Sequence, residues 1–327
     1  MRTVLAVDGG NSKTDVALVG EDGTVLARGR GAGFVPQSAG VPAAIDVIGE
    51  AVRLALGAGT PPPYADHVAA YVAGADLPIE EDLLREEILS RGYGREVVVG
   101  NDTFALLRAG ASEPWGVAVV CGAGINAVGV SPTGEVARYP ALGKISGDWG
   151  GGLGLGEEVL WHAVRAEDGR GPATLLLDAV RLFFGARRAE EVVLGLHFGD
   201  LSSERLHGLV PDLFAAASEG DAVARALVER QADEVAVMGV VALRRLGLLA
   251  EPCEVVLGGG VLTARDPLLM ELVGARYAAQ APRATLVVAD VPPIVGAALL
   301  GLDRLGAGRA AAERLRAAFT GAVSTPV

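Results

Sequence analysis

The first candidate for chemistry is a glycine-rich loop near the N-terminus. It follows a short apolar run and comprises Asp8, Gly9, Gly10, Asn11, Ser12, Lys13 and Thr14. Glycine has no Cβ, so the backbone N–H groups of such a loop can approach phosphate oxygens, and the hydroxyls of Ser12 and Thr14 add donors. Asp8 is suited to hold Mg²⁺ through water, because Mg²⁺ keeps several waters and takes only one or two carboxylates. The loop therefore predicts a phosphate site, with a plain turn as the alternative.

A second loop of the same kind lies further along the chain. Gly122, Ala123 and Gly124 follow an apolar run that ends at Cys121, and another apolar run starts at Ala127. Neither loop is a Walker A motif, because that motif leads into a helix and these loops lie between two predicted strands. Two glycine hairpins of this type could hold the phosphate chain of a nucleotide from both sides.

The elements around the two loops occur in the same order. Apolar runs of β-prone residues predict the strands 4–7, 16–19, 24–27, 67–72 and 96–99. Apolar residues at helical spacing predict the helices 42–56, 80–91 and 103–108. The order strand, loop, strand, turn, strand returns over residues 117–138, and residues 157–250 are rich in helical patterns. We therefore predict an α/β protein made of two duplicated domains with a cleft between them.

The repeat also sets the expected domain boundaries. The first domain is predicted over residues 1–112, and the second over residues 113–305 with a helical insertion. A basic, alanine-rich pattern over 308–319 predicts a C-terminal helix, within 306–327, that packs back on the first domain.

Composition and charge narrow the function classes. The chain has 28 basic and 40 acidic residues, a net charge of −12, which offers no footprint for nucleic acid or an anionic membrane. Its two cysteines, Cys121 and Cys253, lie far apart and predict neither a disulfide framework nor a zinc site. The longest uncharged run, 114–134, contains prolines and glycines unsuited to a membrane helix, and the N-terminus does not resemble a signal peptide. We expect a cytoplasmic protein that binds small molecules.

Together the motifs resemble the superfamily of sugar kinases, heat-shock 70 chaperones and actin, and within it the N-acetylglucosamine kinases and BadF-BadG-BcrA-BcrD ATPases. The Asp8 loop resembles the first phosphate loop and the Gly122 loop resembles the second. Residues Gly258, Gly259 and Gly260 resemble the adenosine motif. Residues 101–102 and 293–297 resemble the two connecting segments. The resemblance spans nearly the whole chain and implies ribonuclease H-like (actin-like ATPase) domains that bind ATP and Mg²⁺.

The resemblance also implies roles for single residues. Asp102 would accept the proton of a sugar hydroxyl that attacks the γ-phosphate, and a helix N-cap is the alternative for this residue. Asn126, Gly143 and Asp148 would lie at the sugar, since hydroxyls need amide groups and bidentate acceptors. The alternatives are a strand-edge side chain for Asn126 and a turn residue for Asp148.

Two positions depart from the family pattern. The asparagine that usually follows the third strand is absent, and Gln37 is the nearest amide, so we expect Gln37 at the sugar. Trp149 stands where the family usually has glutamate. An indole cannot accept a hydrogen bond from a hydroxyl, so Trp149 would stack on a sugar face or fill a pocket. The adjacent glycine-rich run 150–154 has no assigned role.

The expected activity is an ATP-dependent kinase, in a homodimer, for N-acetylglucosamine or a related amino sugar such as glucosamine. Kinases of N-acetylmuramic acid or of another hexose are alternatives. An ATPase activator that shares an iron–sulfur cluster between subunits is a further alternative, but it needs grouped thiolates, and the two cysteines are far apart. A sugar-sensing transcription regulator would need a basic helix-turn-helix pattern, which we do not find.

Overall fold

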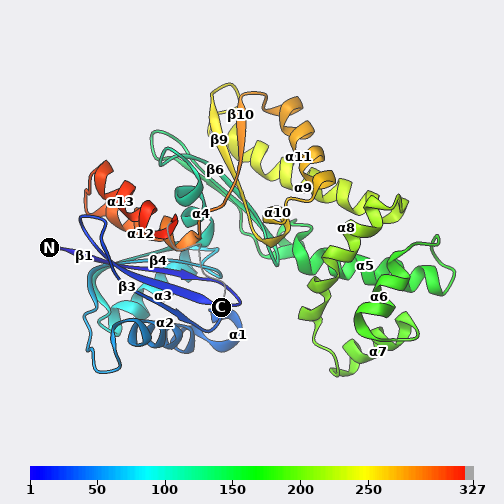
Figure 1. The fold of residues 1–327 in the computed structure, drawn as a ribbon, viewed down its shortest axis with the longest axis horizontal. Coiled ribbons are helices and arrows are strands. Elements are labelled where there is room, and N and C mark those ends of the chain that lie inside the picture. The colour runs from blue at the N-terminus through cyan, green and yellow to red at the C-terminus, as the bar shows by residue number, and fades with distance from the viewer. Residues whose placement is uncertain (321–327) are drawn as a thin grey trace. The chain divides into compact units, whose positions relative to one another are not determined.

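The computed structural model describes residues 1–320, which form two compact units (Figure 1). Among the described residues, the first unit comprises Met1–Gly116 and residues 289–320, and the second comprises Val117–Val288. Within the described residues each unit contains one five-stranded mixed sheet. No described helix is long and apolar enough to cross a membrane.

The first sheet has the strand order β3-β2-β1-β4-β5. Its strands are β1 (Thr3–Gly9), β2 (Thr14–Gly20), β3 (Val25–Gly31), β4 (Ala65–Val72) and β5 (Gly94–Asn101). The first three strands are antiparallel neighbours, whereas β1, β4 and β5 run parallel to one another. The carboxyl ends of β1, β4 and β5 therefore share one edge, which is where open α/β sheets bind ligands.

Alternating residues of β1 serve two separate cores. Leu5 and Val7 pack with Ile45 and Ile48 of α2 (Val41–Leu56), on the face that α3 (Pro78–Ser90) also covers. Val4 and Ala6 face the other way because successive strand side chains point to opposite faces. On that face lie α4 (Asp102–Gly110), α12 (Pro293–Arg304) and α13 (Arg309–Thr320). The sheet is thus buried on both sides.

The helix α12 belongs to the first unit, whereas the sequence predicts it within the second domain, 113–305. A Cβ on Gly296 would overlap the carbonyl oxygen of Ala105, so α12 and α4 cross with their backbones in contact. The C-terminal helix α13 packs on the same unit, with Leu315 fully buried and Phe319 beneath the Arg28 guanidinium at 3.7 Å. The C-terminal segment predicted over residues 306–327 includes 321–327, which lie outside the described residues.

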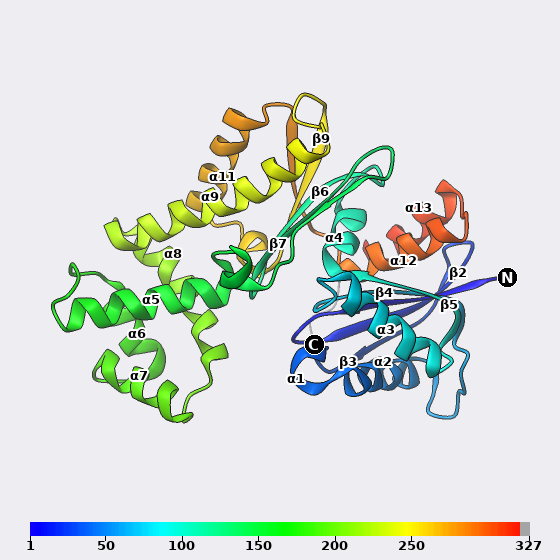
Figure 2. The same cartoon turned by 180° about the vertical axis from the view of Figure 1, so that it is seen from behind.

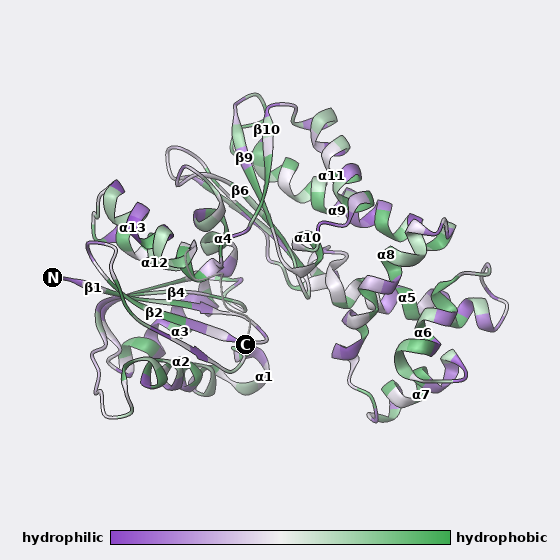
Figure 3. Ribbon diagram, in the orientation of Figure 1, coloured by the Kyte–Doolittle hydropathy of each residue, from purple (hydrophilic) through white to green (hydrophobic). Residues whose placement is uncertain are grey.

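The second sheet repeats the topology of the first, with the order β10-β9-β6-β7-β8. Its strands are β6 (Gly116–Cys121), β7 (Ile125–Val130), β8 (Val136–Arg138), β9 (Cys253–Gly258) and β10 (Ala284–Val288). Read from the other edge, this is again third, second, first, fourth and fifth strand, so the predicted duplicated α/β fold is confirmed. Figures 1 and 2 show α9 (Ala222–Arg245) and α11 (Pro267–Gln280) packed together beside this sheet. In Figure 3 the strands β6 and β9 are coloured mainly as hydrophobic, as expected for strands in the middle of a sheet.

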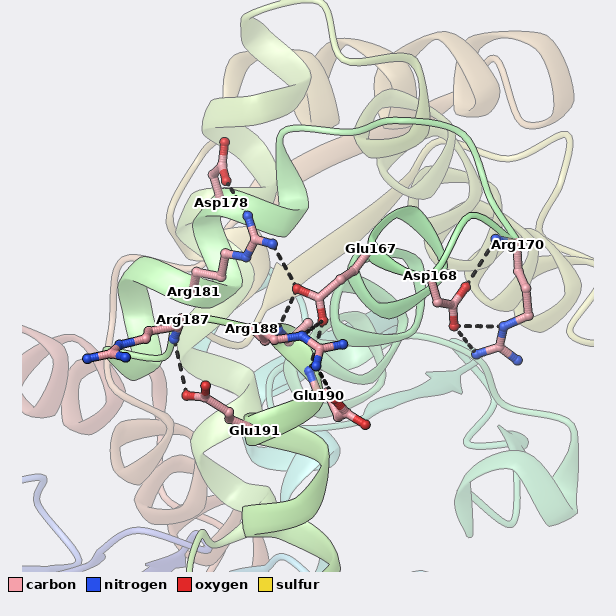
Figure 4. A network of polar contacts seen from close by, with 10 residues as sticks. Glu167, Asp168, Arg170, Asp178, Arg181, Arg187, Arg188, Glu190 and Glu191 are labelled. Carbon is pink, nitrogen blue, oxygen red and sulfur yellow. Dashed lines mark hydrogen bonds and ion pairs between the residues drawn. The ribbon is translucent and has the colours of Figure 1, made fainter.

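Hydrogen bonds to one carboxylate, Glu167, connect the helices of the helical insertion. The insertion comprises α5 (Gly151–Glu167), α6 (Leu176–Phe184), α7 (Ala189–Phe198) and α8 (Val210–Ser218). Glu167, at the end of α5, accepts hydrogen bonds from Arg181 Nη2 at 2.8 Å and from the backbone N–H groups of Ala189 and Glu190 at 3.1 and 3.2 Å (Figure 4). One carboxylate therefore joins α5, α6 and the start of α7, which fits the preference of helix N-termini for negative charge.

Candidate active site and glycine loops

Asp102 lies at the carboxyl edge of the first sheet, as the first residue of α4 directly after β5. The expected alternative role of Asp102 as an N-cap is wrong, because Asn101 caps the helix: its Oδ1 accepts from the N–H of Thr103 at 3.0 Å. Asn101 Nδ2 in turn donates to Asp76 Oδ1 at 2.8 Å, which fixes the amide. Asn101, and not Asp102, is therefore the N-cap of α4.

The charges of Asp8 and Asp102 interact at this edge of the sheet. Burial raises the pKa of Asp102 to about 6, although the backbone N–H of Thr103 opposes the rise. Burial, and next the charge of Asp102, raise the pKa of Asp8 to about 7. Carboxyl groups with pKa values near neutrality are suited to proton transfer. The two acidic groups also fit Mg²⁺, because it takes oxygen ligands and its charge would relieve their repulsion.

The loop after β1 presents its tip to solvent. Asn11, Ser12 and Lys13 are exposed, and the N–H of Gly10 donates to the Lys13 carbonyl at 2.9 Å. Gly9 is required sterically, because a Cβ there would lie 2.8 Å from Val72 Cγ1.

Thr14 differs from the other members of this loop. It is fully buried, and its hydroxyl donates to the carbonyl of Ala32 at 2.7 Å. That hydroxyl therefore holds the chain after β3 in place, and it is the loop's exposed residues that offer groups to a ligand.

A group of charged side chains next to this loop, Asp15, Arg30 and Lys13, was not predicted from the sequence. Arg30 on β3 donates to both oxygens of Asp15, at 2.6 and 3.0 Å, and Lys13 Nζ lies 3.2 Å from Asp15 Oδ2. Burial alone would raise the pKa of Asp15, but the hydrogen bonds from Arg30 and Lys13 lower it. Asp15 also lies opposite Asp8 in the β1–β2 register. The available signal was an acidic residue inside an apolar strand.

Gln37 belongs to the first unit and is exposed on the short helix α1 (Pro36–Ala39). Its Nε2 donates to the carbonyl of Gly74 at 3.1 Å, in the loop that follows β4. This hydrogen bond holds the Gln37 amide, including its oxygen, near the carboxyl edge of the sheet.

In the second unit the glycine groups converge. The N–H of Gly152 donates to the Gly122 carbonyl at 2.7 Å, and the N–H of Leu153 donates to the Ala123 carbonyl at 3.0 Å. Gly151 has a φ of +73°, and a Cβ there would lie 2.5 Å from the backbone of Gly124. The unassigned glycine run therefore begins α5 and lets its N-terminus contact the second loop.

The third glycine group packs on the same loop. Gly259, with a φ of +82°, comes so close that a Cβ would overlap the carbonyl group of Cys121. Gly258 ends β9 and Gly260 begins the short helix α10 (Gly260–Thr263). The second and third glycine motifs thus form one backbone cluster.

Gln231 on α9 anchors this cluster and was missed because it lies far away in sequence. It is fully buried, and its Oε1 accepts from the N–H of Gly151 at 3.0 Å. Its Nε2 finds no hydrogen-bond partner among the described residues. A Cβ on Gly150 would overlap the Gln231 amide, which explains a second glycine of the run.

The residues expected at the sugar also lie in the second unit. Asn126, near the start of β7, accepts from the N–H of Ala127 at 2.7 Å. Asp148 follows the 3₁₀ turn η1 (Gly143–Ser146), and its N–H donates to the Gly143 carbonyl at 3.2 Å. Gly143 is exposed with a φ of +77° and has open space around it, so glycine is needed there for backbone conformation.

Trp149 fills an interior position. The residue is 7% exposed, its Nε1 donates to Glu158 Oε1 at 3.2 Å, and the Arg230 guanidinium lies 4.0 Å from its ring centroid. Of the two expected roles, the structure shows the filled pocket. A second carboxyl group, Glu234 on α9, lies near Asp148: burial raises the pKa of Glu234, and the charge of Asp148 adds to the rise.

The two thiols are buried at opposite ends of neighbouring strands. Cys121 ends β6, whereas Cys253 begins the parallel strand β9. Burial raises the pKa of Cys121 to about 12 and that of Cys253 to about 11. Thiols with such high pKa values stay protonated and are inert, because the thiolate is the form that binds metal.

Comparison with known proteins gives matches over most of the chain. A model described as the BadF/BadG/BcrA/BcrD ATPase family matches residues 5–301. An N-acetylmuramic acid/N-acetylglucosamine kinase of Clostridium acetobutylicum is 24% identical over 80% of this chain and 86% of its own. An N-acetyl-D-glucosamine kinase of Dictyostelium discoideum is 24% identical over 91% and 97%.

Among solved structures, one from Chromobacterium violaceum with the provisional description N-acetylglucosamine kinase has a TM-score of 0.71. It is 24% identical and covers 92% of this chain and 99% of its own. This likeness shows the shared fold.

Proposed function

The chain belongs to the BadF/BadG/BcrA/BcrD ATPase family, and we propose that it is an ATP-dependent kinase of N-acetylglucosamine or a related amino sugar. Both relatives named above are kinases of such sugars, which supports this substrate class. Asp102 carries the proposal, because a partly buried carboxyl group with a pKa of about 6 lies at the carboxyl edge of the first sheet.

In the proposed reaction Asp102 accepts the proton of a sugar hydroxyl while the hydroxyl oxygen attacks the γ-phosphorus and ADP leaves. At pH 7 a group with this pKa is mostly ionised yet still basic enough to take a proton. Asp8 would hold Mg²⁺ through water, and the ion would neutralise charge on the phosphates. Phosphoryl transfer otherwise depends on positioning, which the N–H groups of both glycine loops would supply.

The sugar would be held by side chains of suitable chemistry. Asn126 and Asp148 offer an amide and a carboxylate, and Gln37 offers a second amide. Trp149 is already packed against Glu158, so we assign it no contact with substrate.

The proposal is tested by ADP release from Mg-ATP with a sugar panel: N-acetylglucosamine, glucosamine, N-acetylmannosamine, N-acetylmuramic acid and glucose. We expect strong stimulation by at least one amino sugar and loss of that stimulation in Asp102→Asn. ATP hydrolysis that no sugar changes would contradict the kinase and favour an ATPase activator. The homodimer is a separate part of the proposal, and light scattering of the purified protein checks it.

A further inference from the structure

The turn η1 is tied to Asp148 through a side chain that the proposed function does not use. The N–H of Leu142 donates to Ser146 Oγ at 2.7 Å, and Ser146 Oγ donates to Asp148 Oδ2 at 2.5 Å. The backbone N–H of Asp148 also donates to the Gly143 carbonyl. The turn therefore holds Asp148 at both its backbone and its carboxylate.

The direction of the Ser146 hydroxyl is determined by its neighbours. Its Oγ lies 3.0 Å from the Gly143 carbonyl oxygen and 2.5 Å from the Asp148 carboxylate. A hydroxyl has one proton, and hydrogen bonds to carboxylates are shorter and stronger than those to neutral carbonyls. The proton therefore goes to Asp148. The N–H of Leu142 occupies a lone pair of the same oxygen, which fixes the rotor.

The backbone around the turn adopts conformations that hold this arrangement. Gly143, Gly147 and Gly150 have φ values of +77°, +92° and +105°. Ala141 has a φ of +52°, which is uncommon for a residue with a side chain. Such a conformation persists only where the surrounding structure requires it, and these residues cluster at functional sites.

We propose that Ser146 is a positioning residue that makes Asp148 a one-oxygen acceptor for the sugar, acting mainly through Oδ1. The Ser146 hydroxyl occupies one lone pair of Oδ2 and fixes the carboxylate, so Oδ1 is the oxygen with both lone pairs left for substrate. Asp148 would then accept from one sugar hydroxyl, or from two adjacent hydroxyls through the two lone pairs of Oδ1. The inference rests on the proposed kinase function.

The test compares Ser146→Ala and Ser146→Thr with the wild type, using the sugar that stimulates it most. Threonine retains the hydroxyl, and alanine removes it. Ser218→Ala serves as the matched control, because Ser218 Oγ also makes a local hydrogen bond, to Ala215 at 2.7 Å, on the exposed surface of α8. We measure KM for sugar and for ATP by ADP release, and sugar binding by calorimetry in the presence of ADP.

We expect Ser146→Ala to raise the sugar KM and Kd roughly tenfold, because a freed carboxylate loses its fixed direction. The ATP KM should stay within about twofold, and Ser146→Thr should restore most of the sugar affinity. A Ser146→Ala protein with the wild-type sugar KM overturns the inference. So does an equal rise in both KM values, since that indicates general damage, or a threonine variant as weak as the alanine variant.

Deoxy analogues of the active sugar sharpen the result. The analogue that lacks the hydroxyl held by Oδ1 should bind weakly to the wild type, and Ser146→Ala should weaken its binding little further. If Ser146→Ala weakens every deoxy analogue as much as the parent sugar, the one-oxygen acceptor is wrong. Wild-type protein that neither binds nor phosphorylates any sugar overturns the proposed function itself, which is a distinguishable failure.

Discussion

Replacement of Asp102 by asparagine separates catalysis from stability at this position. Loss of a general base costs about 10² to 10⁴ in rate, or roughly 3 to 5 kcal/mol of transition-state stabilisation. Asparagine retains the shape, and Asn101 continues to cap α4, so the fold should survive. We therefore expect kcat to fall at least 100-fold, with the KM for ATP nearly unchanged.

The same substitution should stabilise the protein. The pKa of Asp102 rises from 3.8 to about 6 on folding, so the ionised carboxylate destabilises the native state by about 3 kcal/mol. Because the folded pKa is the higher one, this cost is absent below pH 3.8, grows between pH 3.8 and 6, and is complete above pH 6. Asp102→Asn should thus raise the thermal midpoint at pH 8 more than at pH 5.

The assay combines sugar-stimulated ADP release, a pH–rate profile and thermal melting. In the wild type, kcat/KM should fall as the pH drops through about 6, because protonation of Asp102 removes the base. Asp82→Asn is the control, since Asp82 is an exposed carboxylate of the same unit in a surface pair with Arg85. Near-normal turnover in Asp102→Asn, or a lower midpoint at pH 8, would refute the reasoning.

Three further predictions concern residues around the loops. Gly151→Ala should raise the KM for ATP and lower stability by about 1 to 2 kcal/mol or more, because its φ is positive and a Cβ would press on Gly124; ATP titration and melting measure this. Gln231→Leu should lower stability by about 1 to 3 kcal/mol by orphaning the Gly151 N–H, and an unchanged melting midpoint contradicts this. Asp15→Asn should lower the pKa of Asp8, because the charge of Asp15 raises it; an unchanged Asp8 pKa in a titration followed by NMR contradicts this.

Local sequence signals were sufficient for the elements and the glycine motifs. The apolar runs on either side of Gly9 and Gly122 are regular enough to place both hairpins, and their repetition gave the duplicated topology. The identity of the helix cap was beyond such reasoning, because Asn101 and Asp102 are adjacent and both cap well. Only the backbone conformation decides that Asn101 is the cap.

Partners distant in sequence could not be predicted. Arg30 binds Asp15 from the neighbouring strand, and Gln231 binds Gly151 from another helix, so neither partner can be identified from the local sequence. The assignment of α12 failed for the same reason, since its contact with α4 depends on Gly296 meeting Ala105. A glycine in sequence does not reveal which distant backbone it approaches.

The position after Asp148 shows how the protein could differ from its relatives in substrate choice. Because Trp149 is packed against Glu158 and Arg230, this position offers the sugar no acceptor in place of the glutamate that the resembled kinases usually have. Ser146 occupies one lone pair of Asp148 Oδ2, so the proposed site has fewer acceptor positions for sugar hydroxyls. A site rejects an analogue strongly only when that analogue leaves a buried polar group of the site unpaired. Fewer acceptors therefore imply weaker discrimination between amino sugars that differ in one hydroxyl, which the proposed sugar panel would reveal as comparable kcat/KM values for several members.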